Sequence, residues 1–559
     1  MARRGGKILV DALLEQGVEH LFGLPGGAVI ALFDELYEAP IKTILTRHEQ
    51  GAGHMADGYA RATGKVGVCV ATSGPGATNL VTAISTAYMD SIPLVAITGQ
   101  VKTHLIGNDA FQEADMTGIS RPITKHNYLV KDARELGRIV REAFYIASTG
   151  RPGPVLIDLP ADVTAQSVEG EIDTAMQLPG YRPSAGGHPG QIRKAAEAIN
   201  ASARPVLYVG GGVITSGASE QLRELARKGN IPVTTTLMGL GVFPETDPLS
   251  LHMLGMHGTV YANYAVTHCD LLIAVGARFD DRITGKIEQF APSAKIIHVD
   301  VDPTSIGKNV RVDIPVVGDA GAILTELLPL VQQHQRGEWL EKIAQWKRDF
   351  PLSYRRGGDE VKPQAVIEEL YRATEGEAIV VTDVGQHQMW AAQYYQYTEP
   401  RTFLSSGGLG TMGFGLPAGI GAQFGRPDKQ VVVVTSDGSL QMNIQEMATA
   451  VLHRLPIKIA LLNNGYLGMV RQWQELFFDR RYSHTYLANG NPDFVKLAEA
   501  YGAVGILVEE PEEVAGALER AMALKEVPVL MDFHTAPEEN VFPMVPAGEA
   551  IDQMLSGMA

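Results

Sequence analysis

The sequence predicts an α/β protein made of three doubly wound parallel-sheet domains. Short runs of β-branched residues alternate with helical patterns along the chain, which is typical of parallel sheets covered by helices on both faces. Glycine accounts for 60 of the 559 residues and gathers after these runs, where α/β proteins turn from strand to helix. At roughly 150 residues per domain, the length also favours three to four domains.

Composition breaks divide the chain. A segment rich in proline and glycine at 178–190 and a charged segment around 347–362 separate three blocks. The predicted domains and a tail therefore cover 1–180, 190–345, 363–540 and 541–559. We expect strands near 42–46, 66–71, 93–98 and 154–158, then 205–209, 232–236, 271–275 and 295–299, and finally 378–382, 429–435, 457–462 and 528–532.

Charge and cysteine content narrow the function classes. The 47 basic and 63 acidic residues give a net charge of −16, which disfavours binding to nucleic acid or to an anionic membrane. Cys69 and Cys269 are the only cysteines, which excludes a disulfide scaffold and fits a reducing compartment. The uncharged stretches 66–89 and 402–425 are interrupted by glycine, proline and polar residues, so we interpret them as buried core. The start lacks the apolar core of a signal peptide, and we expect a cytoplasmic protein.

One glycine pattern points to a ligand without defining it. Residues 408–413 match the GxGxxG pattern of dinucleotide sites. In a chain with 60 glycines a chance match is expected, and the strand before it, 402–404, is short. We interpret the segment as a glycine turn near a ligand and not as a nicotinamide site.

Asp437 and Asn464 suggest a cation site. Each follows an apolar strand, and a predicted helix over 441–453 connects the two strands. A right-handed crossover of this kind brings both side chains to the carboxyl edge of adjacent parallel strands. A carboxylate and an amide oxygen suit Mg²⁺ whose other ligands include phosphate oxygens. The alternative is that Asp437 caps the helix and Asn464 forms a turn.

This pair and a second segment carry a family resemblance. The Asp437-Gly-Ser turn followed by Asn463-Asn464 resembles the thiamine diphosphate and magnesium motif of the thiamine-dependent decarboxylase and carboligase superfamily, with Ser436 in place of the usual glycine. Residues 46–52 resemble the superfamily's catalytic glutamate segment. The resemblance implies that Glu49 hydrogen-bonds N1′ of the aminopyrimidine and stabilises its imino tautomer. The alternative is a glutamate that only suits the dipole of a first helical turn.

Further segments, in order, resemble the catalytic subunit of acetohydroxyacid synthase (acetolactate synthase) over nearly the whole chain: 22–27, 108–113, 253–258, 276–282, 384–390, 409–415 and 467–473. The resemblance implies a pyrimidine-binding domain, a central FAD-binding Rossmann-like domain and a diphosphate-binding domain. It also implies a homodimer or tetramer with active sites at the subunit interface, and a smaller regulatory subunit. The implied reaction decarboxylates pyruvate and condenses the two-carbon unit with a second pyruvate, giving 2-acetolactate, or with 2-oxobutanoate, giving 2-aceto-2-hydroxybutanoate, in branched-chain amino-acid biosynthesis.

The same resemblance implies a set of cofactor contacts. Those to thiamine diphosphate are Glu49, Val384, Gly385, Gln386, His387, Gly410, Met412, Asp437, Gly438, Ser439, Asn464, Gly468 and Met469. The Mg²⁺ ligands are Asp437, Asn464 and the backbone carbonyl of Tyr466. Those to FAD, in a structural role, are Arg151, Gly210, Gly211, Gly212, Leu237, Met238, Gly255, His257, Gly276, Arg278, Asp300 and Asp319. A nucleotide fold that has lost its ligand is the alternative for the central domain.

The implied substrate pocket combines one cation with apolar side chains. Arg282 would meet the carboxylate of the acceptor, for which a planar guanidinium is suited, and Gln112 would donate hydrogen bonds at the reacting centre. The apolar wall would consist of Phe111, Met256, Met469, Val470 and Trp473. Trp473 would favour 2-oxobutanoate, and ordinary core packing is the alternative for the whole wall. Ala161 stands where the family commonly has a lysine, which removes a cation near the entrance.

The same residues bear on other functions within and outside the superfamily. A pyruvate oxidase-like enzyme, in which FAD accepts electrons, is the nearest alternative. A simple decarboxylase is disfavoured because its usual histidine pair is not found, and a glyoxylate carboligase is disfavoured by Glu49. Intact Glu49, Asp437 and Asn464 weigh against a catalytically dead binding subunit.

Overall fold

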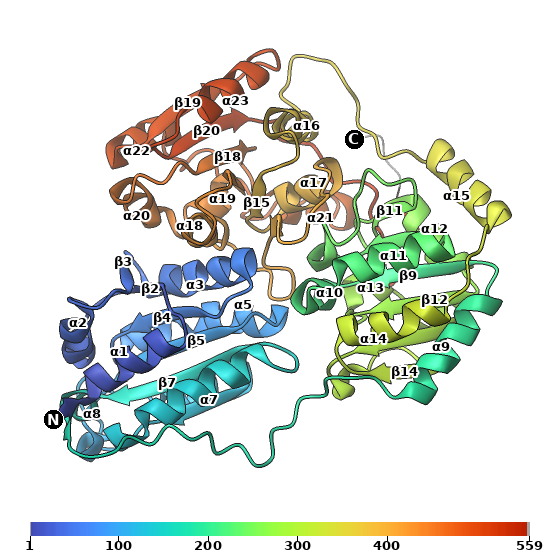
Figure 1. Ribbon diagram of the computed structural model, residues 1–559. Coiled ribbons are helices and arrows are strands. Elements are labelled where there is room, and N and C mark those ends of the chain that lie inside the picture. Colours follow the sequence, from blue (N-terminus) through green and yellow to red (C-terminus); the bar gives the residue numbers. More distant parts are fainter. Residues whose placement is uncertain (1, 556–559) are drawn as a thin grey trace.

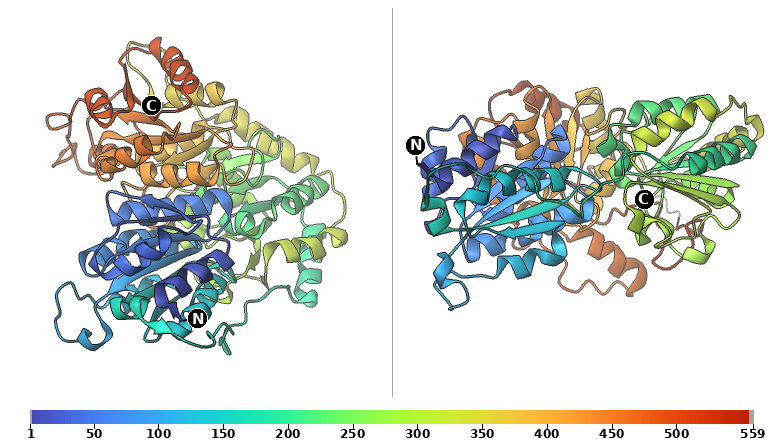
Figure 2. Two further views of the ribbon diagram at one scale, coloured as in Figure 1. Left: turned by 60° about the vertical axis from the view of Figure 1, so that its left-hand side comes forward. Right: turned by 60° about the horizontal axis from the view of Figure 1, so that its bottom comes forward.

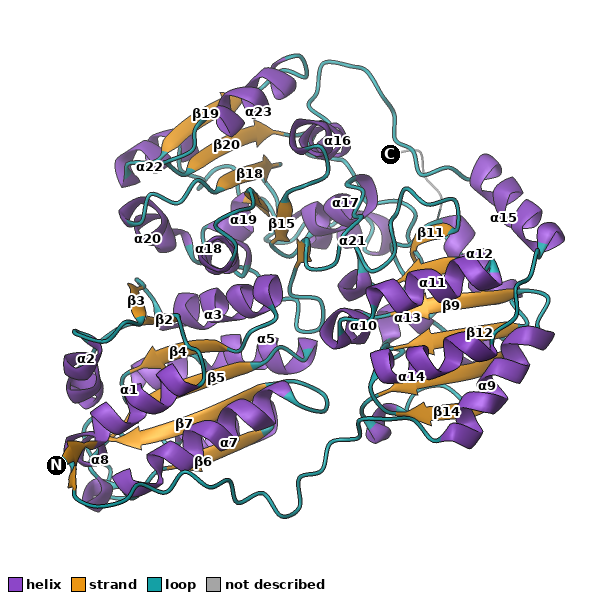
Figure 3. Ribbon diagram, in the orientation of Figure 1, coloured by secondary structure: helices purple, strands orange, loops and turns teal. Residues whose placement is uncertain are grey.

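The computed structural model describes residues 2–555 and contains three six-stranded parallel sheets, each covered by helices (Figures 1 and 3). The predicted fold class, three parallel-sheet α/β domains, is confirmed. Every strand named above from the sequence is present. Within residues 2–555, no helix has both the length and the apolar character to span a bilayer.

The first sheet has the strand order β3-β2-β4-β5-β7-β6. Its strands are β2 (His20–Gly23), β3 (Lys42–Leu45), β4 (Gly67–Ala71), β5 (Leu94–Gln100), β6 (His126–Leu129) and β7 (Pro154–Pro160). Its helices are α1 (Gly5–Glu15), α2 (Ile30–Leu36), α3 (Glu49–Thr63), α4 (Pro75–Asn79), α5 (Val81–Asp90), α6 (Met116–Ser120), α7 (Leu136–Ser148) and α8 (Ala161–Ala165). A short antiparallel pair, β1 (Arg3–Arg4) with β8 (Ser167–Val168), lies outside the sheet.

The central sheet has the order β11-β10-β9-β12-β13-β14. Its strands are β9 (Pro205–Val209), β10 (Val233–Thr235), β11 (Ser250–Met253), β12 (Leu271–Val275), β13 (Lys295–Asp300) and β14 (Ile314–Val317). Its helices are α9 (Pro189–Ala201), α10 (Gly211–Ser216), α11 (Ser219–Gly229), α12 (Val260–His268), α13 (Asp281–Thr284), α14 (Ala320–Leu327) and α15 (Gly337–Asp349).

The third sheet has the order β16-β15-β17-β18-β20-β19. Its strands are β15 (Ile379–Thr382), β16 (Phe403–Leu404), β17 (Val431–Ser436), β18 (Lys458–Asn463), β19 (Val504–Val508) and β20 (Val529–His534). Its helices are α16 (Pro363–Thr374), α17 (Gln386–Tyr394), α18 (Gly415–Gly425), α19 (Asp437–Leu440), α20 (Met447–Leu452), α21 (Gly468–Phe477), α22 (Phe494–Tyr501) and α23 (Glu513–Ala523).

The helix predicted over 441–453 is wrong in its extent. The chain forms α19, a 3₁₀ turn at Ile444–Glu446 and then α20. The interruption falls at Asn443, whose backbone φ of −138° is not helical and whose Nδ2 donates 2.8 Å to the Gly413 carbonyl. A side-chain bond to a distant loop therefore replaces continuous helix at this point.

The first and third domains are stacked on each other, and the central domain lies beside both (Figure 2). Their contact is made by α3 and α18, which run side by side (Figure 1). Gly58 of α3 faces the Ala418 backbone, and Gly421 of α18 faces the Met55 backbone. Because glycine has no Cβ, the two helices approach closely and share one apolar core.

The C-terminal segment crosses from the third domain to the central one. Val545 N donates 2.8 Å to the Met256 carbonyl, and Lys286 N donates 3.0 Å to the Glu549 carbonyl. Ile551 is buried in the central core. The predicted tail, 541–559, is thus packed over its described part, whereas residues 556–559 lie outside the described residues.

Candidate active site

Glu49 lies at the first position of α3, as its place in the sequence predicts. His48 precedes the helix and caps it, because its Nδ1 accepts from Gln50 N at 3.0 Å. The Glu49 carboxylate is buried, and its Oε2 accepts a 3.0 Å hydrogen bond from Asn79 Nδ2. A Cβ added to Gly76 would lie 3.2 Å from Glu49 Oε1, so the glycine leaves space beside the carboxylate.

Gln112 lies against the same glycine turn. A Cβ added to Gly74 would lie 2.9 Å from the Gln112 Cα. Gln112 is exposed, and the neighbouring Phe111 is 89% exposed. Phe111 and Gln112 are thus accessible beside the glycine turn 74–76, against which the buried Glu49 carboxylate also lies.

Asp437 and Asn464 meet at the carboxyl edge of the third sheet. β17 and β18, which precede them, are adjacent and parallel. Asp437 Oδ2 accepts a 2.7 Å bond from Asn491 Nδ2, whereas the buried Oδ1 has no hydrogen-bond partner within residues 2–555. Asn464 Oδ1 accepts a 3.1 Å bond from Tyr466 N.

The donor set at this edge fits a hard cation. Burial raises the pKa of Asp437 to about 6, and no cationic side chain is among the groups that shift it. Among the described residues, no three His, Cys, Asp or Glu side chains group as metal ligands. One carboxylate with an amide oxygen and a carbonyl leaves coordination positions for phosphate oxygens, as Mg²⁺ sites on nucleotides and diphosphates do.

The remaining residues predicted to hold the diphosphate gather around this pair. Ser439 Oγ donates 3.2 Å to the Val384 carbonyl, and Gln386 Oε1 accepts 3.3 Å from Asn464 Nδ2. A Cβ on Gly468 would collide with Gln386 and Asn464. These turns therefore pack closely beside Asp437 and Asn464, and α17 and α21 begin there, with backbone N–H groups of the kind that bind phosphate.

Gly410, Met412, Gly438 and His387, which are also predicted to contact thiamine diphosphate, lie close to the same residues. A Cβ on Gly410 would lie 3.8 Å from Val384 Cγ1, and one on Gly438 would lie 3.7 Å from Met412 Cε. Gly385 has a φ of 155° and faces the His387 ring. Burial lowers the pKa of His387 to about 3, so its imidazole is neutral.

A cavity of about 1090 Å³ lies where the three domains meet. Its volume is at the upper end of ligand pockets. The predicted flavin contacts that line it are Arg151, Gly210, Gly211, Gly212, Leu237, Met238, His257, Gly276, Arg278, Asp300 and Asp319. Gly255 does not line it, because its backbone pairs with Asn263.

The glycine turn after β9 packs closely against the glycine turn after β12. A Cβ on Gly212 would lie 2.7 Å from the Gly276 Cα. Asp300 Oδ1 accepts from Asp302 N at 2.8 Å, and Asp319 caps α14 through Ala322 N at 3.0 Å. The cavity and its glycine wall fit a dinucleotide, although Asp319 already uses one oxygen as a helix cap.

Predicted substrate residues open onto this cavity as well. Met256, Arg282 and Trp473 line it together with Val384, Gly410 and Met469, which are predicted to contact thiamine diphosphate. The Arg282 side chain is 62% exposed, so its guanidinium is accessible. Phe111 and Val470 lie outside the lining and are exposed.

The structure adds residues that sequence patterns did not indicate. Asn79, the last residue of α4, bonds Glu49, and Asn491, in the loop before α22, bonds Asp437. Nothing in the surrounding sequence distinguishes either asparagine. Asp383 accepts from Gly413 N at 2.7 Å and from Thr435 Oγ1 at 3.2 Å, and burial raises its pKa to about 6. Its position directly after β15 could have indicated a site residue, because ligands in such folds bind at the carboxyl ends of the strands.

Family models match in all three domains. The thiamine pyrophosphate enzyme N-terminal TPP-binding domain matches residues 3–119, the central domain matches 192–327 and the C-terminal TPP-binding domain matches 383–533. The fold and the site therefore define a thiamine pyrophosphate-dependent enzyme.

Curated relatives narrow the class. The acetolactate synthase large subunit of Haemophilus influenzae is 50% identical over 99% of this chain and 98% of its own length. The acetolactate synthase isozyme 3 large subunit of Escherichia coli is 49% identical, covering 98% of each chain. The acetolactate synthase large subunit of Corynebacterium glutamicum is 50% identical over 98% of this chain and 89% of its own length. The chain belongs to the acetolactate synthase large-subunit family.

Proposed function

We propose that the chain decarboxylates pyruvate and joins the two-carbon unit to a second pyruvate or to 2-oxobutanoate, giving 2-acetolactate or 2-aceto-2-hydroxybutanoate for branched-chain amino-acid biosynthesis. One observation carries the proposal. Met256, Arg282 and Trp473 open onto the same cavity as Val384, Gly410 and Met469. A guanidinium with apolar neighbours beside the thiamine residues is suited to a short 2-oxo acid.

Thiamine diphosphate, when bound, supplies the nucleophilic carbon that adds to pyruvate and the electron sink for loss of CO₂. Asp437, Asn464 and the Tyr466 carbonyl would hold Mg²⁺ and, through it, the diphosphate. The unpartnered Asp437 Oδ1 supports this role. The turns at Val384–His387, at Gly410–Met412, at Gly438–Ser439 and at Gly468–Met469 would position the cofactor.

Glu49 would hold a proton at N1′ of the aminopyrimidine, with Asn79 fixing the carboxylate. Gln112 would donate a hydrogen bond to the substrate oxygen. Arg282 would bind the acceptor carboxylate in a bidentate manner. Trp473 with Met256 would exclude water and select the alkyl group, where one methylene is worth about 1–3 kcal/mol.

Assembly is part of the proposal. The first domain (1–180) would bind the pyrimidine, the central domain (190–345) FAD, and the third domain (363–540) the diphosphate, with the tail from 541 covering the central domain. Glu49 and Gln112 lie outside the lining of the large cavity, which supports a homodimer or tetramer in which they complete the site of a second copy.

The proposal also includes a smaller regulatory subunit, because the relatives are named as large subunits. Cys69 and Cys269 are free and buried, which supports a cytoplasmic location.

The test follows product and oxygen together. Purified chain with pyruvate, Mg²⁺, thiamine diphosphate and FAD is expected to form acetolactate without oxygen uptake. Glu49→Gln should lower kcat by roughly 10²- to 10⁴-fold, whereas Glu38→Gln, which changes an exposed glutamate, should not. Oxygen consumption with acetate or acetyl phosphate would instead identify the pyruvate oxidase-like alternative.

A further inference from the structure

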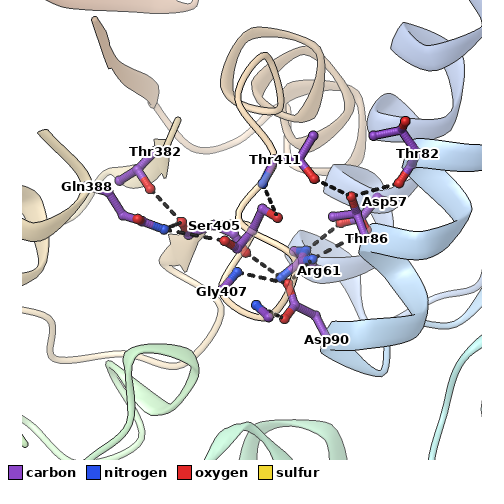
Figure 4. Close-up of polar contacts among 12 residues, drawn as sticks. Asp57, Arg61, Thr82, Thr86, Asp90, Thr382, Gln388, Ser405, Gly407 and Thr411 are labelled. Atoms are coloured by element: carbon purple, nitrogen blue, oxygen red, sulfur yellow. Dashed lines mark hydrogen bonds and ion pairs between the residues drawn. The ribbon is translucent and has the colours of Figure 1, made fainter. Parts of the chain in front are cut away.

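A buried ion cluster connects two helices of the first domain (Figure 4). Arg61 of α3 donates through Nε to Asp57 and through Nη2 to Asp90 of α5, the latter at 2.8 Å. The side chains of Arg61, Asp57 and Asp90 are 5%, 0% and 0% exposed. Burying such charges rarely adds net stability, because desolvation offsets the attraction. Holding α3 to α5 therefore does not by itself account for burying these three charges.

The cluster extends to a loop of the third domain. We call residues 405–413, between β16 and α18, the cofactor loop. Asp90 accepts from two consecutive backbone amides of this loop, Gly408 N at 2.7 Å and Gly407 N at 3.1 Å. Arg61 Nη1 donates 2.7 Å to the Ser405 carbonyl. Hydrogen bonds to ionised groups are shorter and stronger than neutral ones.

The third domain itself holds mainly the ends of the cofactor loop. At one end, Ser405 Oγ is bonded to Thr382 Oγ1 and to Gln388 Nε2, each at 2.7 Å. At the other end, Gly413 N donates 2.7 Å to Asp383. The first domain holds the middle, through Asp90 and through the 2.8 Å bond between the Thr86 and Thr411 hydroxyls (Figure 4).

The middle of the loop faces both proposed cofactor sites. Gly407, Gly408 and Gly410 line the large cavity. A Cβ on Gly407 would lie 2.5 Å from Met238 Sδ, on the flavin side, and one on Gly408 would lie 2.8 Å from Asp90 Oδ1. Gly410 lies against Val384, on the thiamine side. The loop therefore packs closely against Asp90 on one side and against the Met238 thioether on the other.

We propose that Arg61 and Asp90 are positioning residues that fix the cofactor loop of their own chain, and with it Gly410 and Met412, for thiamine diphosphate binding. This inference rests on the proposed function, which assigns Gly410 and Met412 to that cofactor. Helix α3 then has two roles, with Glu49 at its first residue and Arg61 in its last turn. The first domain thereby orders the cofactor site of the chain to which it belongs.

The test compares Asp90→Asn with Asp57→Asn in the full-length chain. Both substitutions remove one carboxylate charge from the cluster, but only Asp90 bonds the loop. Without any cofactor, Asp90→Asn should speed hydrogen exchange of the Gly407 and Gly408 amides at least tenfold. It should also raise the calorimetric dissociation constant of thiamine diphosphate, at saturating Mg²⁺, about tenfold. Asp57→Asn should change each value less than about threefold.

Thr86→Val supplies a second variant that alters no charge. It removes the hydroxyl bond to Thr411 at nearly constant volume, and it should speed loop exchange in the same direction by a smaller factor. Equal effects of Asp90→Asn and Asp57→Asn, or unchanged exchange in Asp90→Asn and Thr86→Val, would overturn the inference. If the unaltered chain binds no thiamine diphosphate, the proposed function fails and the cofactor part of the inference fails with it. The exchange measurement still decides whether Asp90 orders the loop.

Discussion

Glu446 of the third domain accepts a 2.9 Å hydrogen bond from the backbone N–H of His48, the residue before Glu49. The N–H of Arg47 donates to the same carboxylate at 3.0 Å, and Thr449 Oγ1 donates at 2.8 Å. In sequence, Glu446 lies between Asp437 and Asn464. One buried carboxylate therefore connects the proposed magnesium segment of a chain to the proposed catalytic glutamate of that chain.

Glu446→Gln should lower kcat with little effect on cofactor binding. The glutamine is nearly isosteric, and its carbonyl can still accept from His48 N at the Oε1 position. Its NH₂, however, takes the place of Oε2, which lies 3.2 Å from Arg47 N, and the carboxylate charge is lost, so the start of α3 is expected to shift. A displacement of about 1 Å at a reacting group costs on the order of 10²-fold in rate, and we expect a 10- to 100-fold loss. Steady-state kinetics and calorimetry with thiamine diphosphate would measure the two effects separately. Glu142→Gln, which alters another buried glutamate bonded to Tyr128, serves as the control. An unchanged kcat would contradict the expectation.

Asn491→Ala should weaken Mg²⁺ binding. Asn491 orients Asp437 through the 2.7 Å bond to Oδ2, and loss of such a supporting residue typically costs 10- to 100-fold in metal affinity. A Mg²⁺ titration of thiamine diphosphate binding would measure the shift. Asn200→Ala, which removes a bond to the Leu330 carbonyl in the central domain, should leave the titration unchanged. Identical titration curves for the unaltered chain, Asn491→Ala and Asn200→Ala would refute a role for Asn491.

The sequence predicted the long buried strands because each is a continuous apolar run. It missed β6, β11, β14 and β19, which all lie at sheet edges. An edge strand has one neighbour and partial exposure, so the apolar run that marks a buried strand is shortened or mixed. β2 was missed for another reason: it lies inside the sheet, but its apolar run is only Leu21 and Phe22, between a histidine and a glycine.

The candidate site also contains residues that the sequence could indicate and residues that only the structure reveals. Asp437 and Glu49 stand at boundaries between strand and helix, where position along the chain carries information. Asn491, Glu446 and Asp90 act through partners far away in sequence, for example Glu446 on His48. Only the packed structure reveals such pairs, because no local pattern records which distant backbone amide a carboxylate will meet.

Gly212→Ala should abolish flavin binding. The added Cβ would lie 2.7 Å from the Gly276 Cα, and the two turns that line the cavity would have to separate. We expect the purified variant to lack flavin absorbance after incubation with FAD. Gly337→Ala is the matched control, since a Cβ there meets nothing within 4 Å in the same domain. Flavin retained at full stoichiometry in the Gly212 variant would show that the turn tolerates the methyl group.

Asp158 should make stability depend on pH in a predictable direction. Burial raises its pKa to about 6, against an ordinary 3.8, although Thr98 Oγ1 donates to it at 2.8 Å and Gln100 Nε2 at 3.0 Å. Between about pH 4 and 6 the folded chain binds a proton at this group that the unfolded chain does not. This contribution to stability is therefore full below about pH 4 and is lost as the pH rises through 6.

Asp158→Asn removes this titration while the other groups continue to titrate in both proteins. As the pH falls from 7 to 5, the unaltered chain should gain stability relative to the variant by about 1 kcal/mol, roughly half of the ~3 kcal/mol that a shift of about two pKa units contributes in full below about pH 4. Thermal unfolding of both proteins without cofactors, at several pH values, would measure the difference between their midpoints. A difference that stays constant from pH 7 to 5, or that changes in the opposite direction, would show that Asp158 keeps its charge throughout this range.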